Sequence, residues 1–171
     1  WFAEPGVPGV VRMFDPYTYR CPAGHPDPCP VCSGGPHLEE ILQYENPETV
    51  AAVILETVTG TNGLIVPPDG YLQSIREVCD RHGILLIFDE VMTGFGRTGK
   101  WFACEHWDVV PDILTVAKGI NSGYVPLGAM VVSEPIAEWA KSRYFAAGLT
   151  YSGHPLACAS GVASIEAFRE E

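Results

Sequence analysis

The chain has 171 residues, of which 47% are hydrophobic and 18% charged, and its formal net charge is −11. This length and composition fit one globular domain with a sizeable core and exclude a disordered polypeptide. The negative charge argues against nucleic acid or an anionic membrane surface as a partner. No apolar run approaches the ~18 residues that are needed to span a bilayer.

The first part of the chain is rich in proline and glycine. We expect a short strand at residues 10–14, an extended or turn segment at residues 15–20, and a surface loop over residues 21–36. The loop holds four possible zinc ligands in a C-x3-H-x3-C-x2-C spacing, namely Cys21, His25, Cys29 and Cys32. Zinc accepts such ligands, but the spacing is more compact than in zinc fingers and no second C-x2-C pair exists. The sequence therefore favours a loop with unpaired or disulfide-capable cysteines and predicts no metal site.

The remaining cysteines, Cys79, Cys104 and Cys158, fall in other expected elements, where we predict ordinary buried thiols. Nothing in this cysteine usage demands an oxidising compartment, so we expect a cytoplasmic protein. The first residue, Trp1, is not an initiator methionine, so a targeting segment can be absent from the sequence.

The middle of the chain begins with a helix and a strand. Leu38, Ile41 and Leu42 mark a short amphipathic helix, which Asn46-Pro47 ends. Residues 50–55 form an apolar strand that ends on Glu56. A polar loop with two glycines follows at residues 57–63.

A second helix and strand come next. The helix is expected over residues 69–82, with Asp69 as its N-cap and Gly83 as its stop. Its apolar face is formed by Leu72, Ile75, Val78 and Cys79. The following five apolar residues, 84–88, show no alternation and indicate a strand buried on both faces of a parallel sheet. Strand, helix and strand then form a right-handed crossover unit.

The last part of the chain contains two further strands and two helices. A short apolar run at residues 113–117 predicts one strand, and residues 127–132 predict another. Ser133 is expected to cap a short helix, and an alanine-rich helix begins at Pro155, where its small residues permit close packing.

Charged side chains come directly after two of the predicted strands. Asp89-Glu90 follow one, and Lys118 follows the next. Parallel α/β sheets bind ligands outside the carboxyl ends of their strands. A lysine amine can form an imine with the aldehyde of pyridoxal phosphate, and a carboxylate can hold its pyridine nitrogen protonated. The chain has only two other lysines, Lys100 in a loop and Lys141 late in a probable surface helix, so only Lys118 follows an apolar strand.

Three stretches resemble the class III, ω-type aminotransferases. They are FDEVMTGFGRTG at residues 88–99, PDILTVAKG at residues 111–119 and TYSGHP at residues 150–155. The resemblance implies an α/β fold, in which residues 1–171 are part of the large domain of a fold-type I pyridoxal phosphate enzyme. It implies a mostly parallel sheet with one antiparallel strand and flanking helices, and residues 155–171 as the start of the helix that leads toward the small domain.

The same resemblance implies roles for single residues. Lys118 is the Schiff-base lysine, Asp89 is the partner of the pyridinium nitrogen, and these two are catalytic. Val91 packs against the cofactor ring, and Glu56 lies near it. Thr150 reaches the cofactor phosphate of the neighbouring subunit of a homodimer. The expected reaction moves an amino group from an ω-amine or amino acid to a 2-oxo acid.

Two positions depart from the pattern. Met92 stands where many relatives carry glutamine near the phenolic oxygen of the cofactor, and a thioether accepts hydrogen bonds only weakly. Thr61 stands where the glutamate- and ornithine-type members carry a gating glutamate. The ion pair made by that glutamate is therefore not expected, which favours pyruvate as the acceptor.

The resemblance also implies a parent chain more than twice as long, so we interpret this sequence as an internal fragment. The family's phosphate cup and ring-stacking aromatic residue would precede Trp1, and its carboxylate-binding arginine would follow Glu171. We therefore expect the fragment alone to be inactive.

Other functions remain open from the sequence. Residues 94–100 match G-x-x-x-x-G-K of a P-loop ATPase, but Trp101 replaces the serine or threonine that binds magnesium, and no strand leads into the loop. A catalytically inert relative that serves as a scaffold is a further alternative. Aminomutase or racemase action on the same fold is harder to dismiss, because a proton-shuttling lysine serves these reactions as well.

Overall fold

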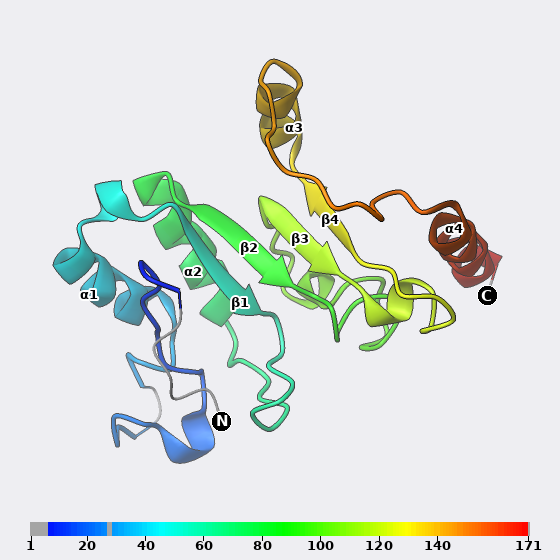
Figure 1. Cartoon of the computed structure of the whole chain (residues 1–171). Coiled ribbons are helices and arrows are strands. Elements are labelled where there is room, and N and C mark those ends of the chain that lie inside the picture. Colours follow the sequence, from blue (N-terminus) through cyan, green and yellow to red (C-terminus); the bar gives the residue numbers. More distant parts are fainter. Residues whose placement is uncertain (1–6, 27–28, 171) are drawn as a thin grey trace.

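A four-stranded sheet organises the chain in the computed structural model, which describes residues 7–26 and 29–170. Its strand order is β1-β2-β3-β4 (Figure 1). The strands are β1 (Ala52–Glu56), β2 (Leu85–Asp89), β3 (Ile113–Val116) and β4 (Ala129–Val132). The first three are parallel, and β4 pairs antiparallel with β3. The predicted mostly parallel sheet with one antiparallel strand is thus confirmed, although β1 begins two residues later than expected and includes Glu56.

Helices α1 (Gly35–Glu45) and α2 (Tyr71–His82) enclose the core on one side of the sheet. The four apolar residues predicted for the face of α2 are all buried. Gly83 ends this helix at a φ of +67°, where glycine is favoured. The prediction of Asp69 as the N-cap was wrong, because Gly70 takes that position at a φ of +80° and no side chain caps the helix.

Two further α-helices lie in the C-terminal part of the chain, α3 (Glu134–Lys141) and α4 (Pro155–Glu170). Short 3-10 helices occur along the chain at η1 (Thr18–Arg20), η2 (Pro47–Thr49), η3 (Ala103–His106) and η4 (Lys118–Ile120). Ser133 occupies the N-cap of α3 as predicted, but without a side-chain hydrogen bond. In α4 a Cβ built on Gly161 would lie 2.7 Å from Leu127 Cδ2, so the expected close packing is observed.

The strand predicted at residues 10–14 is absent, so that prediction was wrong. This segment has no partner strand; instead the backbone N–H of Phe14 donates to Nε2 of His37, 3.3 Å away. The Phe14 ring also stacks on the His37 imidazole with 5.5 Å between centroids. Apolar residues alone do not make a strand when no sheet edge is within reach.

The two faces of the sheet differ in burial. Leu86, Phe88 and Leu114 point toward α2 and are buried, whereas Ile54 on the opposite face is 64% exposed. The expectation of burial on both faces is therefore not met within this chain, because α2 packs on one face and α1 packs against α2 rather than on the other face. None of the described helices is long and apolar enough to cross a membrane.

The half-buried Asp112 ties two layers of the fold together. Asp112 Oδ2 accepts hydrogen bonds from the Leu86 backbone N–H and from the Arg76 guanidinium, each at 2.8 Å, and so joins β2 to α2. Cys79 and Cys104 are buried as expected, but Cys158 is exposed on α4, so the prediction of a buried thiol there was wrong.

Candidate active site

Two carboxylates lie side by side where β1 and β2 end. Glu56 and Asp89 are Cα partners in the register of these strands, and Asp89 pairs in turn with Thr115 of β3. Neighbouring strands are about 4.8 Å apart, and partners point to the same face, here the open one. Like charges placed opposite each other are unfavourable. Since none of the ion pairs found among the described residues involves either acid, this edge suits a cation or a protonated ring nitrogen.

The Asp89 carboxylate is held by the turn that follows it. Its Oδ1 accepts the backbone N–H of Val91 at 2.9 Å, which is the pattern of an Asx turn. This bond fixes the side chain and leaves Oδ2 without a hydrogen bond among the described residues. Asp89 and Val91 are both half-buried. One oxygen therefore orients the group and the other is available to a ligand.

Lys118 begins η4, two residues after β3 ends. Because β2 and β3 are parallel neighbours, Lys118 and Asp89 lie at the same edge of the sheet. The φ of Lys118 is +36°, a left-handed conformation that costs a non-glycine residue about 1 kcal/mol or more and is concentrated at functional sites. The side chain is exposed, so the described residues do not enclose its amine.

The backbone below Lys118 rests on an aromatic loop. A Cβ built on Gly119 would lie 2.9 Å from Phe95 Cβ and 3.2 Å from the Gly94 carbonyl oxygen, so only glycine allows this approach. Phe95 is itself nearly buried and packs edge-on against Phe102 and Trp101, with centroid distances of 5.5 and 6.4 Å. These contacts fix the position of the Lys118 backbone relative to the sheet.

The same loop contradicts the P-loop alternative. It folds back on itself, with the Phe95 backbone N–H donating to the Trp101 carbonyl at 2.6 Å. The four-residue η3 follows instead of a long helix, and Lys100 Nζ donates to the Glu105 carbonyl at 3.0 Å. A phosphate-binding loop needs a helix N-terminus directly behind its glycines, and this loop has none.

Glu90 is a buried carboxylate whose role sequence reasoning missed. It is 0% exposed and accepts three hydrogen bonds: from Cys104 N to Oε1 at 2.7 Å, and from Ala103 N and Thr93 Oγ1 to Oε2 at 2.6 and 3.1 Å. Burial raises the pKa of the neighbouring Cys104 thiol to about 12, and the negative charge of Glu90 adds to this shift. Glu90 thus holds the start of η3 and the far end of the aromatic loop.

We expect the Glu90→Gln substitution to destabilise the protein by about 3 kcal/mol, measured by chemical denaturation of the complete protein. The amide would present its NH2 to a backbone N–H and leave a buried donor without an acceptor. Glu105→Gln is the matched control: Glu105 is exposed, accepts one bond from Phe102 N at 2.8 Å, and a glutamine keeps that bond. Its expected effect is below about 0.5 kcal/mol, and equal effects of the two variants would contradict the role of Glu90.

Comparison with known proteins identifies the family. The family model of the class-III aminotransferases matches residues 13–171. The chain belongs to the class-III aminotransferases. These enzymes use pyridoxal phosphate, and the membership confirms the predicted family, fold and cofactor.

Three relatives illustrate the similarity. The chain is 46% identical to an (S)-enantioselective ω-transaminase from Thermomicrobium roseum, over 99% of this chain and 38% of that one, with a TM-score of 0.90. It is 54% identical to a taurine:2-oxoglutarate aminotransferase from Bifidobacterium kashiwanohense, solved with PLP and glutamate, over 78% and 30% and with a TM-score of 0.77. It is 42% identical to a putrescine–pyruvate aminotransferase of Pseudomonas aeruginosa, over 96% of this chain and 36% of that protein. The chain thus spans about a third of the length of the curated relatives that it matches.

The residues at this edge of the aminotransferase chain fit the cofactor. Asp89 Oδ2 carries no hydrogen bond among the described residues and stands next to a second carboxylate, which suits a protonated pyridine nitrogen. Glu56 Oε2 is oriented by the Gly60 backbone N–H at 2.9 Å. Met92 covers Gly60, where a Cβ would lie 2.5 Å from its sulfur, so the thioether packs on the backbone of that loop.

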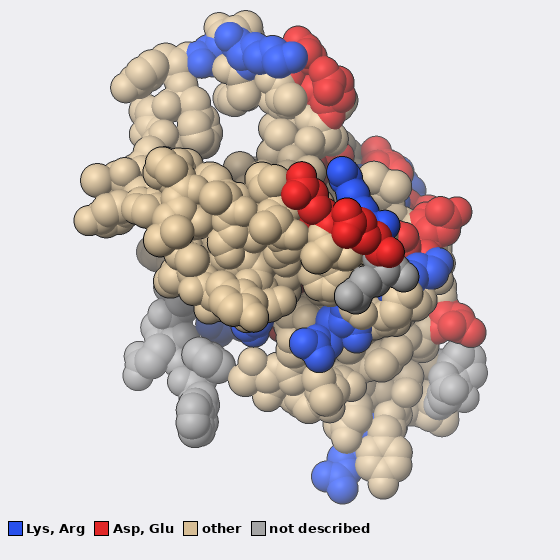
Figure 2. All heavy atoms as spheres, turned by 90° about the vertical axis from the view of Figure 1, so that its right-hand side faces the viewer, with Lys and Arg blue, Asp and Glu red and all other residues tan. Residues whose placement is uncertain are grey.

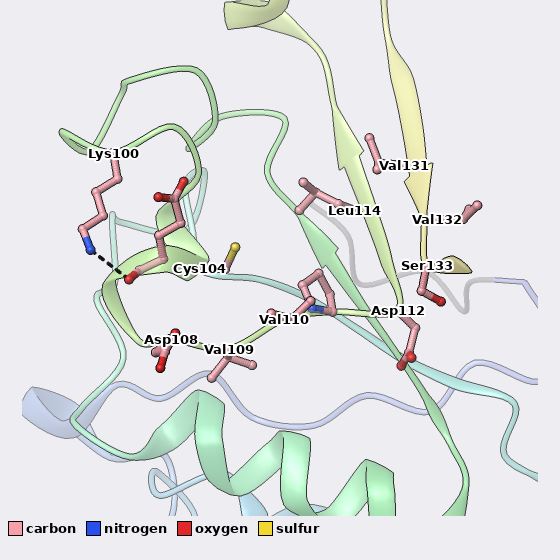
Figure 3. Close-up of a pocket in the computed structure, with 12 residues that line it drawn as sticks. Lys100, Cys104, Asp108, Val109, Val110, Asp112, Leu114, Val131, Val132 and Ser133 are labelled. Atoms are coloured by element: carbon pink, nitrogen blue, oxygen red, sulfur yellow. Dashed lines mark hydrogen bonds between the residues drawn. The ribbon is translucent and has the colours of Figure 1, made fainter. Parts of the chain in front are cut away.

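Thr150 does not join this cluster within the chain. It is exposed in a turn closed by the bond from Ser152 N to the Leu149 carbonyl at 3.0 Å, between α3 and α4. A hollow of the described surface also lies elsewhere (Figure 3). It is lined by Asp112 and Leu114 at the start of β3 and by Val131 and Val132 of β4, toward the opposite end of the parallel strands, and takes no part in the site.

Proposed function

We propose that the complete protein is a pyridoxal-phosphate-dependent aminotransferase that moves an amino group from an ω-amine or amino acid to a 2-oxo acid. The observation that carries this proposal is the row of Glu56 and Asp89 on one face, with Lys118 after the adjacent strand. Family membership agrees with it.

Each residue has a distinct task in this proposal. The cofactor supplies an aldehyde for the amino group and a ring that accepts electrons from the substrate α-carbon. Lys118 Nζ would bind the aldehyde carbon of the cofactor in the absence of substrate, and it would move the proton at the substrate α-carbon. Asp89 Oδ2 would keep the proton on the ring nitrogen, and Val91 would pack against the ring. Glu56 adds negative charge on the same side.

The position of Thr150 supports a site shared between two subunits. The segment from residue 142 to residue 154 exposes large apolar side chains, among them Tyr144 at 93% and Tyr151 at 80%. Figure 2, which views the molecule from the α4 side, shows a broad area without charged side chains. Exposed apolar areas of this kind mark protein interfaces. In this proposal the partner of a homodimer covers the segment, and Thr150 reaches the cofactor phosphate of the partner's site.

Pyruvate is the acceptor that the chain favours. Thr61, which is exposed in the loop after β1, offers no carboxylate to pair with an arginine. The similarity to a putrescine–pyruvate aminotransferase supports this choice. Because the chain is also similar to a taurine:2-oxoglutarate aminotransferase, 2-oxoglutarate must be tested beside pyruvate.

The experiment measures amino transfer by the complete protein, loaded with pyridoxal phosphate, from a panel of ω-amines and ω-amino acids. We expect pyruvate to be used about tenfold faster or more than 2-oxoglutarate, a difference within the range that a binding pocket provides. The Lys118→Ala protein serves as the blank. A preference for 2-oxoglutarate would contradict the assignment of pyruvate as the acceptor. The absence of transfer to either acid would contradict the proposed function.

A further inference from the structure

The loop before α1 brings together three groups that bind metal ions. Cys21, His25 and Cys29 place one ligand atom each within 4.8 Å of one another. The two sulfurs are 3.1 Å apart, and Cys29 Sγ lies 3.7 Å from His25 Nδ1. The described residues of this segment, 21–26 and 29, form no helix or strand, so no regular element forces these side chains together.

Cys32 lies next to this set, at the other end of the turn that begins at Cys29. Its backbone N–H donates to Cys29 Sγ at 3.4 Å, and the Ser33 N–H donates to the Cys29 carbonyl at 2.9 Å. Cys32 is only 1% exposed, so its side chain is buried beside this turn. A C-x2-C spacing is one by which two cysteines bind a single zinc ion.

The distance between the Cys21 and Cys29 sulfurs fits neither a disulfide bond nor two unrelated buried thiols. A disulfide needs about 2.05 Å between sulfurs, whereas two thiolates on a tetrahedral zinc ion, each with a bond of about 2.3 Å, lie about 3.8 Å apart. The observed 3.1 Å between Cys21 and Cys29 lies between these values. Moving these two sulfurs apart by about 0.7 Å, the difference between about 3.8 Å and 3.1 Å, gives room for the ion.

We propose that Cys21, His25, Cys29 and Cys32 form a structural zinc site with a Cys3His ligand set. Four protein ligands leave no open position, as in zinc sites that stabilise a fold rather than catalyse. The inference is independent of the proposed aminotransferase activity, because none of these residues lies at the edge that carries Asp89 and Lys118.

The zinc site clamps the start of the chain onto the core. After Cys32 the loop is anchored on α2, where Ser74 Oγ donates to the Ser33 carbonyl at 2.7 Å and accepts the Gly35 N–H at 3.0 Å. Before Cys21 the chain reaches the loop that follows Glu56, where Asn62 Nδ2 donates to Asp15 Oδ2 at 2.6 Å. Between these anchors the described residues of the loop make few backbone hydrogen bonds, and in this proposal the ion supplies a cross-link.

The test is elemental analysis of the complete protein, purified without chelators and under reducing conditions. We expect about one zinc ion per chain. The Cys29→Ser variant loses the ion, while Cys158→Ser, which removes an exposed cysteine on α4, keeps it. After exchange into cobalt(II), wild type and Cys158→Ser show strong sulfur-to-cobalt absorbance, and Cys29→Ser does not.

His25→Ala provides a variant that still folds, because the imidazole is exposed. We expect it to release zinc to a chelator at least about tenfold faster than wild type, with His154→Ala, another exposed histidine, as the matched control. Zinc-free protein in which Cys21, Cys29 and Cys32 all react with an alkylating reagent would overturn the proposal. A Cys21–Cys29 disulfide in the native protein would overturn it as well.

Discussion

The Lys118→Ala protein is expected to lose the visible absorbance of a lysine-bound cofactor and to transfer amino groups about 10³-fold more slowly or worse. The substitution removes both the point of attachment and the group that moves the α-proton, and general acid–base groups contribute about 10²- to 10⁴-fold. Because the Lys118 side chain is exposed, its loss removes no packing, so the unfolding temperature should stay close to that of wild type. Absorbance spectra and single-turnover rates measure the two effects separately.

Lys100→Ala and Lys141→Ala are the matched controls, since these are the only other lysines of the chain. Lys100 bonds the Glu105 carbonyl and Lys141 pairs with Glu138 on α3, both at the surface. Borohydride reduction of wild type and of both controls should fix the cofactor to the peptide that carries Lys118. A reduced cofactor on any other lysine, or on the Lys118→Ala protein, would refute the assignment.

Asp89→Asn is expected to lower kcat by about 10²- to 10³-fold, the range observed when one electrostatic contact to developing charge is removed. Asparagine keeps an oxygen for the Val91 N–H, so the turn stays in place and only the negative charge is lost. The covalent attachment through Lys118 does not depend on that charge. The variant should therefore keep the lysine-bound absorbance while losing turnover, a combination opposite to that of Lys118→Ala.

Asp69→Asn provides the control, because Asp69 is exposed before α2 and makes no contact with the site. Its kcat should equal that of wild type. Glu56→Gln removes the neighbouring carboxylate and should have a smaller effect than Asp89→Asn. Turnover of Asp89→Asn within about threefold of wild type would show that another group holds the ring proton.

The sequence predicted the parts of the fold that depend on local periodicity. The apolar positions of α2 recur every three or four residues, and all four became buried. The unalternating run before Asp89 identified β2, and the geometry of parallel strands then placed Asp89 and Lys118 at one edge. This reasoning required only the direction of neighbouring strands, not their distance in sequence.

Predictions failed where distant partners decide the outcome. Glu90 follows Asp89 in the sequence, yet its three bonds come from Thr93 and from backbone groups 13 and 14 residues later, and no local pattern reveals them. The segment at residues 10–14 has strand-like composition but no strand beside it. The spacing of Cys21 and Cys29 in the sequence does not give the distance between their sulfurs, which only the folded loop shows.

The antiparallel pairing of β3 with β4 has a consequence for access to the Lys118 amine. The chain reverses within the twelve residues from 117 to 128, so Lys118 stands at the base of a connection whose two ends are fixed in the same sheet. Asn121 is buried, and its side-chain amide braces this connection. Its Nδ2 donates to the Val125 carbonyl at 2.6 Å, and its Oδ1 accepts the Gly123 N–H at 3.2 Å. Beyond that brace, Ser122 and Tyr124 are exposed. Changes in length or bulk at this tip are therefore expected to alter the surroundings of the Lys118 amine while the Lys118 backbone keeps its position.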